Sequence, residues 1–200
     1  MDRRDHRVAR AEGAKAVTFT LPTDLAPEVY PLAWLVGEWS GTGFIEYPDI
    51  PKVEFRSDVS FTHDGGPYLI YSATMTVVGD DGEDGPIWAS ERGYWRVPPQ
   101  TPEGLALREN QFPVEVLLAD ASGSIAMLIG AVGNGRVDLA SDVMARSASA
   151  PRVDGATRLY GHVGGELMFA YDIAAFGNEL RSYASGRMHR VEPQARPEES

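Results

Sequence analysis

Hydrophobic and polar residues alternate with a period of two along most of the chain. Between residues 53 and 61 the odd positions carry mainly apolar side chains, and the even positions carry charged or polar ones. Successive side chains of a strand point to opposite faces, so this pattern predicts a strand with one buried face. Further strand-length runs occur at 68–78, 87–97, 105–111, 114–119, 124–131, 136–144, 157–162, 166–174 and 179–191. Glycine, proline, asparagine and aspartate cluster between these runs, which is typical of hairpin turns.

Helical patterning is confined to residues 31–36, where Pro31 suits a first helical turn and Gly37 suits the stop. About ten twisted antiparallel strands tend to close or to split into two layers. We therefore predict an all-β fold, a closed antiparallel β-barrel of about ten strands that is lipocalin-like and has one short capping helix. Barrels of eight strands already hold one small ligand, so this barrel is expected to contain a cavity.

The two ends of the chain differ from its middle. Residues 1–16 are rich in charge and lack hydrophobic periodicity, and residues 193–200 are similar. These segments are predicted to be a flexible N-terminal arm and a flexible C-terminal tail. The barrel domain is assigned to residues 17–192.

Composition excludes several classes of partner. Eighteen Lys and Arg residues against 29 Asp and Glu residues give a net charge of −11, which repels nucleic-acid phosphate. No apolar run approaches the ~20 residues that a membrane span requires. The chain has no cysteine, and its N-terminus lacks the apolar region of a signal peptide. We therefore expect a cytoplasmic protein without a membrane span or a nucleic-acid partner.

One strand is unusually rich in glycine. Gly37, Trp39, Gly41 and Gly43 are all odd-numbered and share one face of an extended strand. Two interpretations stay open. Trp39 plugs the barrel floor while the glycines let the strand coil, or the glycines make room for a flat ligand.

The same strand carries a family resemblance. Residues 37–43 read Gly-Glu-Trp-Ser-Gly-Thr-Gly and resemble the GxWxGxG signature of the nitrobindin family. Glu-Tyr-Pro at 46–48 and Glu-Arg-Gly-Tyr-Trp-Arg at 91–96 match later parts of the family in order, and the resemblance covers about residues 31–191. It implies a ten-stranded barrel, similar to fatty-acid-binding proteins, that holds ferric haem b through a histidine near the C-terminus. Nitric oxide binding and peroxynitrite isomerisation are the activities that it implies.

The chain departs from the family at the haem ligand. The family's last strand has leucine, two residues and then histidine, whereas Leu180 is followed at that spacing by Tyr183. His189 lies six residues later, nearly 20 Å along a strand at ~3.3 Å per residue, so it does not substitute. The sequence thus resembles the ferric nitrobindin-like branch without the haem histidine, and no cofactor and no metal are expected.

Tyr183 supports three interpretations. Its phenolate could ligate ferric haem b, as tyrosinate does in catalase. It could instead contact an organic ligand beside Arg181 and Arg187, which share its strand parity and whose guanidinium groups suit a carboxylate. The third interpretation is a structural or cavity-lining tyrosine that binds nothing, and without a bulge its parity faces away from the apolar side of the strand. Other residues either line the cavity or belong to the core: Trp88, Tyr94, Trp95, Arg158, Phe169, Tyr171 and Asn178.

Three functional hypotheses follow. The favoured one is a barrel that binds a small hydrophobic molecule, including one with a carboxylate, with Tyr183, Arg181, Arg187 and Trp39 as candidate ligand-binding residues and no catalytic residue. The second is a ferric haem protein that uses Tyr183 as ligand and binds nitric oxide or isomerises peroxynitrite. The third is a filled barrel that acts as a structural or interaction module. A homodimer is expected slightly more than a monomer.

Overall fold

The computed structural model describes residues 22–192, which form one 3₁₀ helix and ten strands. The predicted arm and tail, and residues 17–21 of the predicted barrel domain, lie outside the described residues. The helix is η1 (Pro27–Leu35). The strands are β1 (Gly37–Tyr47), β2 (Ile50–Thr62), β3 (Leu69–Val78), β4 (Asp84–Arg96), β5 (Phe112–Asp120), β6 (Ser124–Gly133), β7 (Arg136–Arg146), β8 (Val153–Val163), β9 (Glu166–Ala175) and β10 (Arg181–Arg190).

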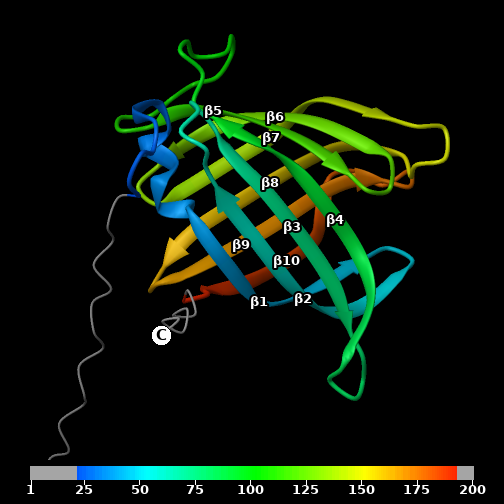
Figure 1. The fold of residues 1–200 in the computed structure, drawn as a ribbon. Helices are drawn as coiled ribbons and strands as arrows, with labels where there is room; N and C mark the ends of the chain where they lie inside the picture. Colours follow the sequence, from blue (N-terminus) through cyan, green and yellow to red (C-terminus); the bar gives the residue numbers. More distant parts are fainter. Residues whose placement is uncertain (1–21, 193–200) are drawn as a thin grey trace, which may run out of the picture.

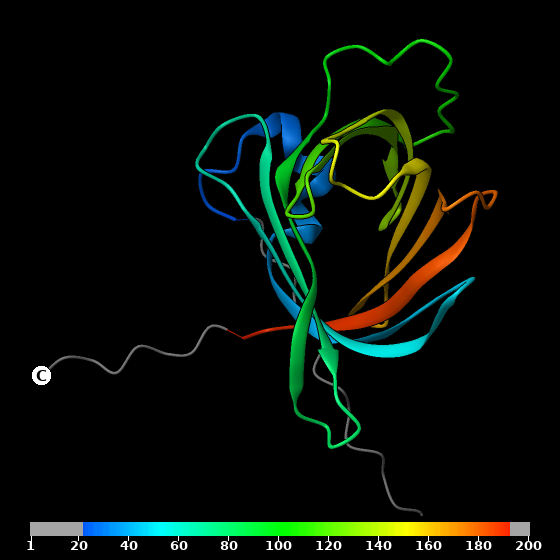
Figure 2. The same cartoon turned by 90° about the vertical axis from the view of Figure 1, so that its right-hand side faces the viewer.

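The ten strands form a closed barrel. Each strand pairs antiparallel with its neighbours in sequence, and β1 pairs with β10 to complete the ring (Figure 1). The turned view in Figure 2 shows the strands wrapping around a common interior. The predicted all-β closed barrel with a short helix is confirmed.

The period-two pattern places the apolar faces inside. In β2 the side chains of Phe55, Val59 and Phe61 are buried, and the polar residues between them are more exposed. The glycines of β1 serve close packing. A Cβ on Gly41 would lie 2.0 Å from the carbonyl oxygen of Arg187, and one on Gly43 would lie 2.7 Å from Cζ of Phe55. The space over these glycines is therefore taken up by β10 and by the Phe55 ring.

The end of the barrel next to η1 is packed solid. The indole nitrogen of Trp39 donates to the carbonyl of Leu35 at 2.7 Å. The guanidinium of Arg190 lies 4.2 Å from the centre of the Trp39 ring and donates to the carbonyls of Trp34 and Val36. Further large side chains are fully buried in the core, including Leu32, Leu35, Phe61, Trp95 and Tyr160. Trp39 thus belongs to the closed floor of the barrel.

Two predicted elements differ from the structure. The helix predicted at 31–36 begins earlier, at Pro27, and has 3₁₀ geometry. Residues 105–111, predicted as a strand, form part of the loop between β4 and β5 that projects from the barrel (Figure 1). Because β4 pairs directly with β5, the closed ring leaves no edge for another strand, and the positive φ of 62° at Asn110 is incompatible with an extended strand.

The described part of the chain contains no helix with the length and apolarity needed to cross a membrane.

Candidate ligand-binding site

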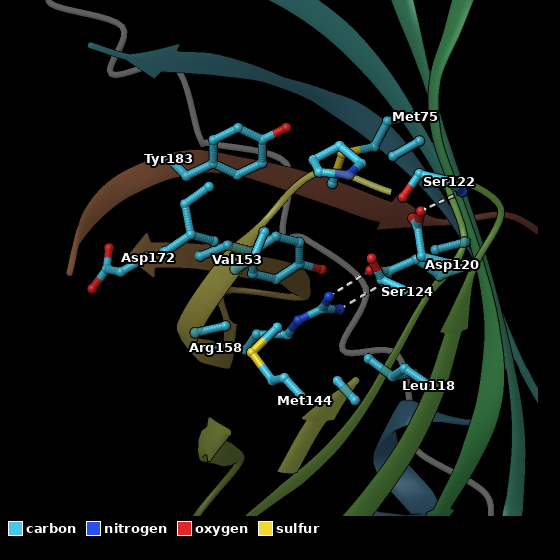
Figure 3. Close-up of a pocket in the computed structure, with 18 of the residues that line it drawn as sticks. Met75, Leu118, Asp120, Ser122, Ser124, Met144, Val153, Arg158, Asp172 and Tyr183 are labelled. Atoms are coloured by element: carbon cyan, nitrogen blue, oxygen red, sulfur yellow. Dashed lines mark hydrogen bonds and ion pairs between the residues drawn. The ribbon is translucent and has the colours of Figure 1, made fainter. Parts of the chain in front are cut away.

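The half of the barrel away from η1 contains a cavity of about 350 Å³. Its walls are formed by the strand ends that lie far from η1. They include the end of β5 and the starts of β4, β8 and β10. Most of the exposed lining is apolar, with Met75, Leu118 and Met144 among the contributors (Figure 3). The volume lies within the range of small-molecule pockets in proteins, roughly 300–1,000 Å³.

Tyr183 reaches this cavity because β10 contains a bulge. The β9–β10 register shifts between Ser182 and Ala184, so one residue is inserted at Tyr183. The next residue, Ala184, is buried in the barrel, and Tyr183 also lines the cavity. Strict alternation would have sent these two neighbours to opposite faces. The bulge re-aims a side chain next to a binding site, as bulges often do.

Trp88 and Tyr183 meet across the barrel. The indole nitrogen of Trp88 on β4 donates to the phenolic oxygen of Tyr183 at 2.6 Å. The Tyr47 ring packs edge-on against Tyr183, with the ring centres 6.0 Å apart. Burial raises the pKa of Tyr183 above its ordinary value, the Trp88 hydrogen bond partly opposes this, and the charges of Asp120 and Glu91 raise it further. The surroundings of Tyr183 therefore favour the neutral phenol.

A buried ion pair crosses the interior of the barrel beside the cavity. Arg158 donates from its two terminal nitrogens to the two oxygens of Glu91, at 2.7 and 2.5 Å. The two side chains are only 13% and 17% exposed, and the guanidinium lies 4.5 Å from the centre of the Tyr171 ring. Burial opposes ionisation of Glu91, but the charge and hydrogen bonds of Arg158 outweigh it and hold the pKa of Glu91 below its ordinary value. Glu91 and Arg158 thus form a charged pair in which each group is the hydrogen-bonding partner of the other.

The predicted ligand-binding residues are not brought together. Tyr183 alone among them lines the cavity. Arg187 is exposed, and Arg181 lies with Glu46 and Lys52 beside the β1–β2 hairpin. Trp39 lies in the opposite, filled half. The expectation of a ligand carboxylate therefore loses the two cations on which it rested.

The undecided aromatic and polar residues are distributed among the cavity, the core and the outer surface. Trp88, Arg158 and Tyr171 line the cavity, whereas Trp95 is fully buried in the filled half and Tyr94 is exposed. Glu91 and Asp120 are cavity residues that the sequence reasoning did not single out. Glu91 shares the parity of the inward-facing Trp95, and an acidic residue on the inner face of a strand is a signal that could have found it.

Histidine is absent from this cavity among residues 22–192. His162 packs against Trp34 with ring centres 6.0 Å apart, and His189 lies 3.3 Å from Glu166 at the end of β10. Nδ1 of His63 is buried without a partner in the turn after β2. His6 is outside the described residues. No group of three or more His, Cys, Asp or Glu residues in the described chain could hold a metal ion. The residues present do not fit a haem iron held through imidazole.

Three comparisons place this geometry beside known proteins. The family model of the THAP4-like, heme-binding β-barrel domain matches residues 28–190. A ferric nitrobindin-like protein of Beutenbergia cavernae is 43% identical, over 88% of this chain and all of its own. A peroxynitrite isomerase of Clavibacter michiganensis is 39% identical, over 86% of this chain and 98% of its own. The crystal structure of Rv2717c from M. tuberculosis superimposes with a TM-score of 0.68 at 29% identity, covering 84% of this chain and 99% of that one.

Proposed function

Because the chain belongs to the family of THAP4-like, heme-binding β-barrel domains, we propose that it binds a small hydrophobic molecule in the cavity beneath Tyr183. The observation that carries the proposal is the uneven filling of the barrel. Large side chains pack the half next to η1, whereas about 350 Å³ stays open in the other half. A barrel that acted only as a structural module would have no need of this space.

The chemistry of the walls supports a ligand with an apolar body. Met75, Leu118 and Met144 supply flexible and aliphatic contacts, and the rings of Trp88 and Tyr183 supply flat ones. Thioether side chains adapt to ligands of different shape. The hydrogen-bonded pair Trp88 and Tyr183 and the ion pair beside the cavity offer a small number of polar contacts that would orient the ligand.

Native mass spectrometry of the protein as isolated would identify a resident molecule. A titration with N-phenyl-1-naphthylamine, a neutral probe that becomes fluorescent in apolar sites, tests the cavity itself. Ala126→Phe places a ring in the cavity and should weaken probe binding by about tenfold or more, because it removes the space that the probe needs. Ala140→Phe adds the same ring at an exposed position of β7 and should leave binding unchanged. Equal affinities of the two variants would refute the proposal.

The second candidate is ferric haem bound through Tyr183. The observation in its favour is the bulge, which turns the phenol into the cavity. Two observations oppose it, since the phenolic oxygen already accepts the Trp88 hydrogen bond and its pKa is raised. Ligation requires the phenolate, so the iron would have to supply the stabilisation that the protein does not. Several relatives are named peroxynitrite isomerase. This chain would have that activity only if it binds haem, as the second candidate requires.

Adding hemin to the purified protein separates the two candidates. The first predicts no stoichiometric complex with a Soret band that depends on Tyr183. The second predicts such a complex and its loss in Tyr183→Phe. Tyr94→Phe, which removes a phenol from the exposed outer face, is the matched control.

A further inference from the structure

We infer that the cavity selects ligands with a positively charged head on the apolar body, and that Asp120 is the residue that sets this preference. The inference rests on the proposed binding function and specifies its ligand class.

Two carboxylates stand side by side on one wall. Glu91 of β4 and Asp120 of β5 are direct partners across the β4–β5 ladder, and both line the cavity. Directly opposed residues of an antiparallel pair have Cβ atoms roughly 4.5–5.5 Å apart, and like charges in this arrangement destabilise the sheet. A positive charge between or beside the two carboxylates would relieve this repulsion.

The protein supplies only part of that charge. Both terminal nitrogens of Arg158 are used on the two oxygens of Glu91. Asp120 accepts a hydrogen bond from the backbone nitrogen of Ser122 at 2.7 Å and forms no ion pair with any residue of the described chain (Figure 3). Within residues 22–192, the Asp120 carboxylate therefore has no cationic side chain as a partner.

The other charged groups near the cavity do not change this balance. Asp172 also lines the cavity, but its carboxylate points away from it in Figure 3 and lies 3.3 Å from the hydroxyl of Thr157. Arg181 and Arg187 lie outside the lining. The interior thus has an excess of negative charge, which attracts cations and repels carboxylates.

Aromatic rings add a second reason to expect a cation. Trp88, Tyr171 and Tyr183 all border the cavity, and Tyr171 already carries the guanidinium of Arg158 at 4.5 Å from its centre. The faces of indole and phenol rings attract ammonium groups. An amine whose apolar body lies against Met75 and Leu118 would bring its head towards Asp120 and these rings.

Three probes of nearly equal shape test the charge preference by calorimetric titration: 2-naphthylmethylamine, 2-naphthalenemethanol and 2-naphthoic acid. The amine should bind about tenfold more tightly than the acid, with the neutral alcohol between them, as one partly buried charge pair predicts. Asp120→Asn keeps the acceptor for the Ser122 nitrogen and should abolish most of this difference. Glu54→Gln removes one negative charge from the exposed outer face of β2 and should leave the difference intact.

Each outcome has a distinct meaning. If the acid binds as tightly as the amine while the alcohol also binds, the charge inference is wrong and the binding function stands. A preference for the amine that persists in Asp120→Asn would remove Asp120 from its assigned role. If none of the three probes binds, the proposed function fails together with the inference.

Discussion

The indole nitrogen of Trp88 lies 2.6 Å from the phenolic oxygen of Tyr183, although their strands, β4 and β10, are not neighbours in the barrel. Both side chains line the cavity, so the contact spans the barrel interior instead of following the sheet. The pair also ties together two strands that no backbone ladder connects.

Tyr183→Phe should lower the free energy of unfolding by about 1 kcal/mol, because the Trp88 hydrogen bond loses its acceptor. The loss stays modest because the Trp88 side chain is partly exposed and its N–H can turn to water. Urea unfolding would measure it. Tyr94→Phe removes an exposed phenol of β4 and should change stability by less than about 0.5 kcal/mol. Equal stability of the two variants would contradict the prediction.

Glu91→Leu should destabilise the fold by about 3–5 kcal/mol, since it leaves the guanidinium of Arg158 buried and unpaired. Replacing both residues by leucine should recover most of this loss, because no buried charge is then left. Thermal or urea unfolding of the single and double variants provides the measurement. Glu115→Gln breaks the more exposed pair with Arg96 and is expected to have an effect below about 1 kcal/mol. A single variant as stable as the parent protein would show that the pair is not formed.

Lowering the pH should reduce the free energy of unfolding through the Glu91–Arg158 pair. The pKa of Glu91 in the folded protein lies below its ordinary value of 4.5. Its ionised form is therefore stabilised by folding, and this contribution is present in full above pH 4.5 and is lost as the pH falls through the lowered pKa. Unfolding free energies measured at descending pH should fall more steeply for the parent protein than for the double leucine variant. Parallel curves below pH 4.5 would argue against the assignment.

Gly41→Ala should destabilise the barrel by about 1–3 kcal/mol, because the added methyl group meets the backbone of β10 at Arg187 and Met188. Backbone atoms in a ladder cannot move aside as a flexible side chain can. Gly161→Ala, in β8, is the control, since nothing lies within 4 Å of the added Cβ. It should be neutral or stabilising by about 0.4–1 kcal/mol. The two substitutions would be compared by unfolding in urea, and a Gly41→Ala variant as stable as Gly161→Ala would refute the close packing of β1 on β10.

Local patterns were sufficient to predict the barrel, because alternation and turn residues report directly on strands with one buried face. The same rule failed at 105–111, where Leu105 and Leu107 imitate a short strand but the ring is already closed. Pattern alone does not reveal whether a strand has an edge to pair with. That information belongs to the complete topology.

The site was less predictable than the fold. A one-residue bulge decides that Tyr183 faces the cavity, and it also cancels the shared parity that had grouped this residue with Arg181 and Arg187. The Glu91–Arg158 pair joins residues 67 positions apart, and Glu91 meets Asp120 only through the β4–β5 register. Such contacts depend on how strands align across the barrel, which no short segment of sequence specifies.

Closure of the ring also has a consequence for the order of folding. Arg190 of the last strand donates to the carbonyl of Val36, 154 positions earlier, and β10 pairs with β1. Contacts between such distant segments carry a high loop-closure entropy and are associated with slow folding. During synthesis β1 lacks one of its two neighbouring strands until residues 181–190 have left the ribosome. Until then its backbone groups are an open edge, so this interval is when the growing chain is most exposed to pairing with the wrong strand.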